Sequence, residues 1–217
     1  MLVSTIISDG RSIADVPNTN FYTAADALFS VQSSWVDLYS IMCEGNDDYF
    51  VTQVYTTLAA GFTADANRTY VYNYTLPASF YRLRLFQYQP DGTLFYPVAK
   101  MNLENFGNLQ NGPGYRLQGA YLSLYTQIEY TNWCIWYYPA PVTLATGTDI
   151  LYPNSAVTQI MAYQVAIDIR RKQNLDYLDK QQRRDELIAT MKNQLNRDDA
   201  KAETPKNVFN QGFAPYI

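Results

Sequence analysis

The chain of 217 residues contains no histidine and only two cysteines. Without histidine it lacks the commonest general base and metal ligand, which excludes Ser-His-Asp and Cys-His catalysis and histidine-based metal sites. Cys43 and Cys134 lie too far apart in the sequence to suggest a zinc site. Two lone thiols fit a reducing compartment, so we expect both to be free, with a disulfide between them as the less favoured alternative.

Long apolar runs and phosphate-binding glycine motifs are also missing. No stretch approaches the roughly 18 apolar residues of a membrane span, and Asp9, Gly10 and Arg11 interrupt the apolar N-terminal stretch, so we expect neither a membrane segment nor a secretory leader. The glycines form neither GxGxxG nor GxxxxGK[ST]. These absences predict a protein that is not an enzyme and holds no cofactor or metal.

Aromatic side chains are abundant: the chain has 20 tyrosines, 10 phenylalanines and 3 tryptophans. Such rigid, partly polar rings are typical of surfaces that pack proteins against each other. The formal net charge is −4, and it is unevenly spread. Residues 1–150 carry 6 basic against 12 acidic side chains, whereas residues 151–217 carry 10 against 8. An acidic, aromatic region of this kind is not expected to grip nucleic acid.

Helical periodicity occurs at both ends of the chain. Residues 2–15 predict a short helix that Gly10 weakens. Thr23 and Asp26 have the spacing of a capping box, and the apolar residues that follow recur at three- and four-residue steps until Glu44–Gly45. The members of this apolar face are Leu28, Val31, Trp35, Leu38, Tyr39 and Met42.

The middle of the chain has the composition of β-strands, rich in Tyr, Val, Phe, Thr and Trp. Strands are predicted at 49–55, 69–75, 81–88, 93–97, 115–117, 121–125 and 128–137. Alternation places Arg82 and Arg84 on one face of their strand and Leu83 and Leu85 on the other. The last strand changes phase between Tyr130 and Trp133, which predicts either a bulge near 131–132 or burial on both faces.

A second helical region follows at 155–172 and 176–196, and its short connection predicts an antiparallel hairpin. The second helix is highly charged. Its Arg183, Arg184, Asp185 and Glu186 are candidates for a subunit interface, the alternative being a solvated face. Residues 197–217 are predicted to be an extended arm, either disordered or ordered by a partner, whose candidate anchors are the aromatic residues Phe209, Phe213 and Tyr216.

The predicted fold class is therefore α+β: N-terminal helices, a central antiparallel β-rich domain, and a C-terminal helical hairpin followed by an extended arm. The expected divisions are 1–48 for the N-terminal helices, 49–150 for the β-rich domain, 151–196 for a hairpin packed on the N-terminal helices, and 197–217 for the arm.

Several strings, in this order, resemble one family. Residues 76–83 form a proline–aromatic lead into a strand, residues 114–124 (GYRLQGAYLSL) a hairpin, residues 136–144 (WYYPAPVTL) a strand exit, and residues 150–153 (ILYP) the start of a helix. A charged helix then ends in MKNQLN at 191–196. Over most of residues 20–197 the chain resembles the head-to-tail adaptor, or connector, proteins of tailed bacteriophages.

The resemblance implies a non-enzymatic virion protein at the head–tail junction, assembled in the host cytoplasm. It would form a ring, expected to be a dodecamer like the portal, with sister copies, the portal protein, and tail or nozzle proteins as partners and no membrane. DNA would only pass through, and like charge in an acidic ring would keep it mobile. The helices at 155–172 and 176–196 would pack subunits, and the arm would dock on the portal.

Other functions stay open from the residues alone. Aromatic strands could instead form a carbohydrate- or receptor-binding β module of a virion or cell surface. A glycosidase could use paired acids such as Asp47 and Asp48 near Glu44, although solvated turn acids are the default. A structural protein of a non-tailed virus is a further alternative.

Overall fold

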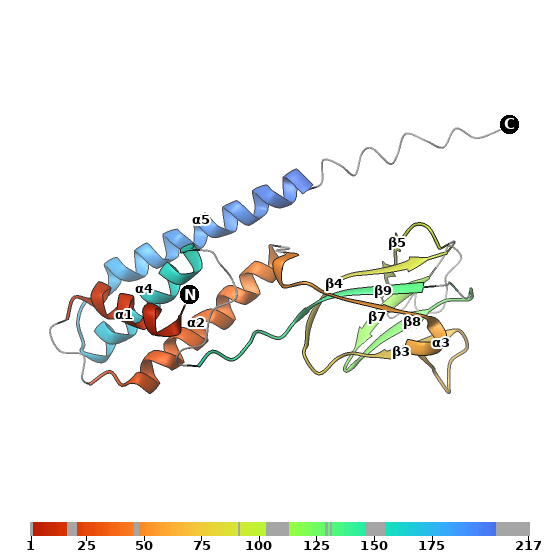
Figure 1. The fold of residues 1–217 in the computed structure, drawn as a ribbon, viewed down its shortest axis with the longest axis horizontal. Coiled ribbons are helices and arrows are strands. Elements are labelled where there is room, and N and C mark those ends of the chain that lie inside the picture. The colour runs from red at the N-terminus through yellow and green to blue at the C-terminus, as the bar shows by residue number, and fades with distance from the viewer. Residues whose placement is uncertain are drawn as a thin grey trace. The chain divides into compact units, whose positions relative to one another are not determined.

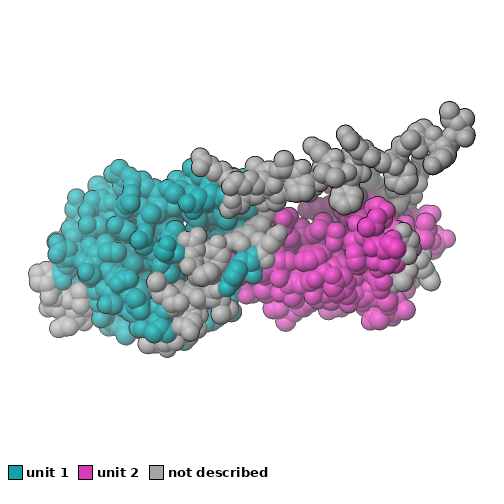
Figure 2. Space-filling view, turned by 45° about the horizontal axis from the view of Figure 1, so that its top comes forward, with its two compact units in different colours: residues 1–49, 141–217 teal, residues 50–140 magenta. Residues whose placement is uncertain are grey.

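The computed structural model describes residues 2–16, 21–45, 48–90, 92–102, 113–128, 130, 132–145 and 155–202, with the backbone alone for 48 and 197–202. The fold is α+β: along the sequence, helices come before and after the strands, which form antiparallel-rich sheets (Figure 1). The chain divides into two compact units, residues 1–49 with 141–217 and residues 50–140, which Figure 2 colours separately. The predicted fold class is thus confirmed for the described residues.

The N-terminal part of the helical unit consists of α1 (Val3–Ala14) and α2 (Ala24–Glu44). The predicted capping box at the start of α2 is present. The backbone N–H of Asp26 donates to Thr23 Oγ1 at 3.2 Å, and the backbone N–H of Thr23 donates to Asp26 Oδ2 at 2.8 Å. These two bonds satisfy backbone donors that the first helical turn leaves unpaired, which fixes where α2 begins.

The C-terminal part of the helical unit is a hairpin of α4 (Ser155–Lys172) and α5 (Leu178–Ala202). Arg184 of α5 donates to Gln164, and Gln181 accepts from Arg171, so the helices run antiparallel as predicted. The unit's core is formed by buried side chains of α1, α2 and α4, together with Met191 of α5: Val3, Ile6, Val31, Trp35, Leu38, Met42, Val157, Ile160, Met161 and Val165.

The extended arm was predicted to begin too early. Residues 197–202 continue α5, because no glycine or proline occurs between Asn196 and Pro205 and the intervening residues include the helix formers Ala200, Lys201 and Ala202. The remaining arm, residues 203–217, lies outside the described residues.

Gly10 allows a close crossing of two helices. A Cβ atom at this position would lie 2.6 Å from Val165 Cβ and 2.9 Å from the backbone oxygen of Ala162, both on α4. The sequence indicated only that Gly10 weakens α1, since glycine is a poor helix former. Its missing side chain is what lets α1 and α4 approach each other.

The second unit contains two sheets. The four-stranded sheet has the order β1 (Thr52–Thr56), β9 (Asn132–Pro139), β4 (Phe80–Gln89), β5 (Tyr96–Pro97). The five-stranded sheet has the order β2 (Thr63–Ala64), β3 (Val71–Thr75), β8 (Tyr121–Tyr125), β7 (Gly114–Gln118), β6 (Ala99–Lys100). Neighbouring strands are antiparallel, except that β6 and β7 are parallel. The seven predicted strands all occur, whereas β2, β6 and the short helix α3 (Leu58–Gly61) were not predicted.

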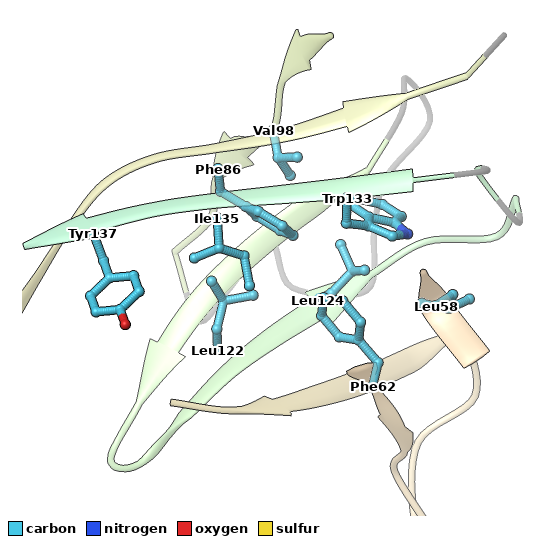
Figure 3. Close-up of a cluster of buried hydrophobic side chains, with 9 residues drawn as sticks. All are labelled: Leu58, Phe62, Phe86, Val98, Leu122, Leu124, Trp133, Ile135 and Tyr137. Atoms are coloured by element: carbon cyan, nitrogen blue, oxygen red, sulfur yellow. The ribbon is translucent and has the colours of Figure 1, made fainter. Parts of the chain in front are cut away.

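The two sheets share one hydrophobic core (Figure 3). Phe86 and Trp133 of the four-stranded sheet stack with ring centroids 5.4 Å apart, and Phe86 meets Tyr115 of β7 edge to face at 5.6 Å. Phe62, at the end of α3, contacts both Phe86 and Trp133. The complete buried cluster is Leu58, Phe62, Phe86, Val98, Leu122, Leu124, Trp133, Ile135 and Tyr137. Much of the aromatic content therefore serves as core.

The predicted placement of Leu83 and Leu85 on one face of their strand is wrong. The pairing of β4 with β9 shifts at Tyr81 and again at Arg84, so Leu83 lies opposite Tyr137 while Leu85 lies opposite Trp136. Adjacent residues of β9 point to opposite faces, and hence Leu83 packs on the core whereas Leu85 is exposed. Each shift inserts one extra residue into β4 and reverses the alternation beyond it.

The phase change in the last predicted strand has a simple cause. β9 begins at Asn132, so Ile128 and Tyr130 precede it and need not match its alternation. Within the strand, Trp133, Cys134, Ile135, Tyr137 and Tyr138 are all buried. β9 is therefore buried on both faces, as one of the two alternatives predicted. The other alternative, a bulge near 131–132, involves Thr131, which lies outside the described residues.

Candidate protein-interaction surface

An open groove lies on the surface of the helical unit, beside the first half of α2 and the C-terminal end of α4. It has a volume of about 640 Å³ and is lined by Tyr22, Ala25, Asp26, Phe29, Ser30, Asp168, Arg171 and Lys172. Phe29 is 75% exposed, the largest exposed fraction among the large apolar side chains of the described residues. Phe29 and Ala25 provide apolar surface, and the α4 residues provide charge. We call this region the Phe29 groove.

A chain of hydrogen bonds fixes the wall of the Phe29 groove. The Ser30 hydroxyl donates to Asp168 Oδ2 at 2.6 Å and so accepts from the Tyr22 hydroxyl at 2.5 Å. Gln164 Nε2 donates to both oxygens of Asp168 at 3.1 Å, and Arg184 donates to Gln164 Oε1. These bonds join α2, α4 and α5, so the groove wall is held by three helices and not by one mobile side chain.

Tyr22, which lines the groove, has a shifted pKa. Burial, followed by the negative charges of Asp168 and Asp26, raises the pKa of Tyr22 to about 12, although the bond to Ser30 acts in the opposite direction. The phenol therefore stays protonated at neutral pH and is neither a base nor a nucleophile. Its role is to donate a hydrogen bond that positions Ser30.

The rim of the groove carries paired charges. Lys172 Nζ lies 2.7 Å from Asp26 Oδ2, and hydrogen bonds from Lys172 and Thr23 lower the pKa of Asp26 to about 2. Arg171 lies 4.0 Å from Asp168 Oδ1 and 4.5 Å from the ring centroid of Tyr177. Both cations are a little under half exposed and can exchange these partners for groups of a neighbouring protein at small cost.

Sequence reasoning did not identify Phe29. The predicted apolar face of α2 comprises Leu28, Val31, Trp35 and the residues in step with them, and Phe29 lies off that face. A large aromatic residue on the polar side of an amphipathic helix was the available signal. Val36, seven residues further along and on the same side of α2, is also exposed, so the apolar surface extends along the helix.

The predicted interface residues on α5 form pairs within their own helix. Arg183 Nη1 lies 2.8 Å from Glu186 Oε2, and both side chains are at least half exposed. Arg184 donates to Asp185 Oδ1 from Nε at 3.0 Å and from Nη2 at 2.7 Å, in addition to its bond to Gln164. Arg183, Asp185 and Glu186 remain accessible to a partner, whereas Arg184 is engaged inside the helical unit.

Other predicted candidates lie outside the described residues. These are the arm anchors Phe209, Phe213 and Tyr216, together with Asp47. Neither Cys43 nor Cys134 takes part in a disulfide, as predicted, and both side chains are buried. Among the residues that the structure describes, no three His, Cys, Asp or Glu side chains gather as they would around a metal ion. Every described helix is too short or too polar to span a lipid bilayer.

Comparison with known proteins adds no family assignment. No protein-family model matches the chain, and no curated protein matches its sequence.

Proposed function

We propose that this protein is a non-enzymatic structural component of a tailed bacteriophage, a ring-forming adaptor below the portal that joins capsid to tail. The element order supports the proposal, since N-terminal helices, a β-rich unit and a C-terminal helical hairpin follow each other as in the family that the sequence resembles. The ring is expected to be a dodecamer in keeping with the portal, and DNA passes through it without specific binding.

The observation that carries the proposal is the exposed ring of Phe29 above a groove with a rigid wall. Phe29 is 75% exposed, and Ala25 beside it and the exposed Val36 on the same side of α2 extend its apolar surface, which is typical of a protein contact. In a ring-shaped oligomer, each subunit presents its Phe29 groove to the next subunit. The net charge of −6 in residues 1–150 also suits a channel that must not hold DNA.

Assembly tests the proposal. Purified full-length chain, alone and mixed with the portal protein of the same phage, is examined by native mass spectrometry and electron microscopy. We expect rings that attach to the portal, and we expect the chain among the proteins of purified particles. A chain that stays monomeric with the portal and is missing from particles contradicts the proposal.

The arm is tested by truncation. Because α5 continues to Ala202, the informative truncated chain ends at that residue, so that the helix stays whole. We expect this shortened chain to keep its fold and lose portal attachment, since burial of each of Phe209, Phe213 and Tyr216 would contribute roughly 1.5–3 kcal/mol. Normal attachment of the shortened chain contradicts the role of the arm.

A further inference from the structure

The outer face of the four-stranded sheet carries an aromatic patch of its own. Trp133, Ile135 and Tyr137 of β9 point into the shared core, so Cys134 and Trp136 point to the other face. Strand register places Gln53 of β1 beside Trp136. It likewise places Tyr55 of β1 and Gln87 of β4 on either side of Cys134.

Each ring of this patch is held by a neighbour. The indole Nε1–H of Trp136 donates to Gln87 Oε1 at 3.0 Å. Gln53 Nε2 donates to the hydroxyl of Tyr55 and, at 3.3 Å, to Cys134 Sγ. The ring of Phe95, which precedes β5, lies 5.9 Å from the ring of Tyr55, centroid to centroid. We call Gln53, Tyr55, Gln87, Phe95 and Trp136 the amide–aromatic patch.

The amide–aromatic patch retains hydrogen-bonding capacity. Gln53 uses its amide nitrogen and Gln87 its amide oxygen, which leaves Gln53 Oε1 and Gln87 Nε2 without a partner among the described residues. Gln53 Oε1 is an acceptor and Gln87 Nε2 is a donor. Trp136 adjoins both amides, because it lies opposite Gln53 in the strand register and donates to Gln87. Tyr55 is 61% exposed and the other four side chains are partly exposed, so a ligand can reach the patch.

We propose that the amide–aromatic patch binds a neutral carbohydrate chain. A sugar ring presents an apolar C–H face that packs on an aromatic ring, and its hydroxyls both donate and accept hydrogen bonds, as a free amide nitrogen and a free amide oxygen require. None of the five side chains is charged, which matches an uncharged ligand. A single-stranded nucleic acid also stacks on aromatic rings, but its phosphates need a basic groove that this patch does not provide.

Intrinsic fluorescence provides a selective test. Trp35 is 1% and Trp133 0% exposed, so Trp136 is the tryptophan that a bound sugar can reach. Full-length protein is titrated with maltohexaose, cellohexaose and chitohexaose up to about 10 mM, a range that covers weak millimolar binding. We expect a saturable change with at least one of them, and a shift of the Trp136 indole N–H resonance in NMR spectra of the same titration.

Variants locate the site. Tyr55→Ala and Gln87→Ala are expected to weaken binding by roughly tenfold or more, because each removes one of a few contacts to a small ligand. Tyr121→Ala, an exposed tyrosine of the other sheet, is the matched control and is expected to bind like the wild type. The indole resonance reports on the wild-type chain, so this test does not depend on the variants folding.

Three results overturn the proposal. The first is the absence of a saturable response to all three oligosaccharides. The second is binding that Tyr55→Ala and Gln87→Ala leave unchanged. The third is a Trp136 resonance that responds to subunit assembly but to none of the sugars, which identifies the patch as a protein contact. The site lies within the β-rich unit, so sugar binding and ring assembly can succeed or fail independently.

Discussion

Replacing Phe29 with alanine separates an interface role from a folding role. The ring of Phe29 is 75% exposed, and the core of the helical unit lies on the other side of α2. Its removal therefore opens no core cavity, and alanine is the better helix former by a few tenths of a kcal/mol. We expect the free energy of unfolding of the single chain to change by no more than about 0.5 kcal/mol.

The expected effect on assembly follows from the area that remains to be buried. Full burial of a phenylalanine side chain contributes roughly 1.5–3 kcal/mol, and about three quarters of that is still available at Phe29, or about 1–2 kcal/mol per contact. This corresponds to a weakening of each subunit contact by roughly 5- to 30-fold. A closed ring repeats the contact at every subunit, so the concentration at which rings form should rise steeply.

The concentration at which rings form is measured by diluting each protein in steps and determining its mass by size-exclusion chromatography with light scattering. Tyr121→Ala, which removes another exposed ring from the β-rich unit, serves as the control and should assemble like the wild type. Urea unfolding of each variant measures the fold separately. Equal assembly of the two variants would refute the interface role of Phe29. A loss of more than about 2 kcal/mol of unfolding free energy in Phe29→Ala would show that the ring belongs to the core.

Three further predictions concern stability. Gly10→Ala should lower the unfolding free energy by roughly 1–3 kcal/mol in thermal or urea unfolding, despite better helix propensity, because its Cβ would lie 2.6 Å from Val165 Cβ; the exposed Ser8→Ala in the same helix should be near neutral. Asp26 has a pKa of about 2 in the fold against its usual 3.8, so its contribution to the free energy of unfolding is complete above about pH 4 and is lost as pH falls toward 2. Asp26→Asn should flatten this part of the pH–stability curve, and an unchanged curve contradicts the pairing of Asp26 with Lys172. Leu124→Ala should lower the unfolding free energy by about 3 kcal/mol in urea, and a loss below about 1 kcal/mol would be incompatible with its complete burial.

Local signals in the sequence located most elements. The start of α2 was predictable because Thr23 and Asp26 satisfy each other's backbone groups, which is a property of four consecutive residues. The strand at 121–125 and the turn before it were also predictable from local residues, because Gly119 can adopt the positive φ of +57° that the turn requires. Where three or four neighbours decide the conformation, sequence reasoning is sufficient.

Features set by distant partners were not predictable. The facing of Leu83 and Leu85 depends on how β4 aligns with β9, some fifty residues away, and no local residue marks the extra positions. The need for glycine at position 10 arises from the close approach of α4, which follows the β-rich unit in the sequence. The Phe29 groove and the amide–aromatic patch likewise form only when separate elements meet, although the position of Phe29 off the apolar face was a visible clue.

Electron microscopy of the purified full-length chain mixed with its portal protein shows whether the chain forms rings on the portal. We expect closed rings of this chain seated on the portal. Portal particles that remain bare, beside a chain that stays single, would contradict it.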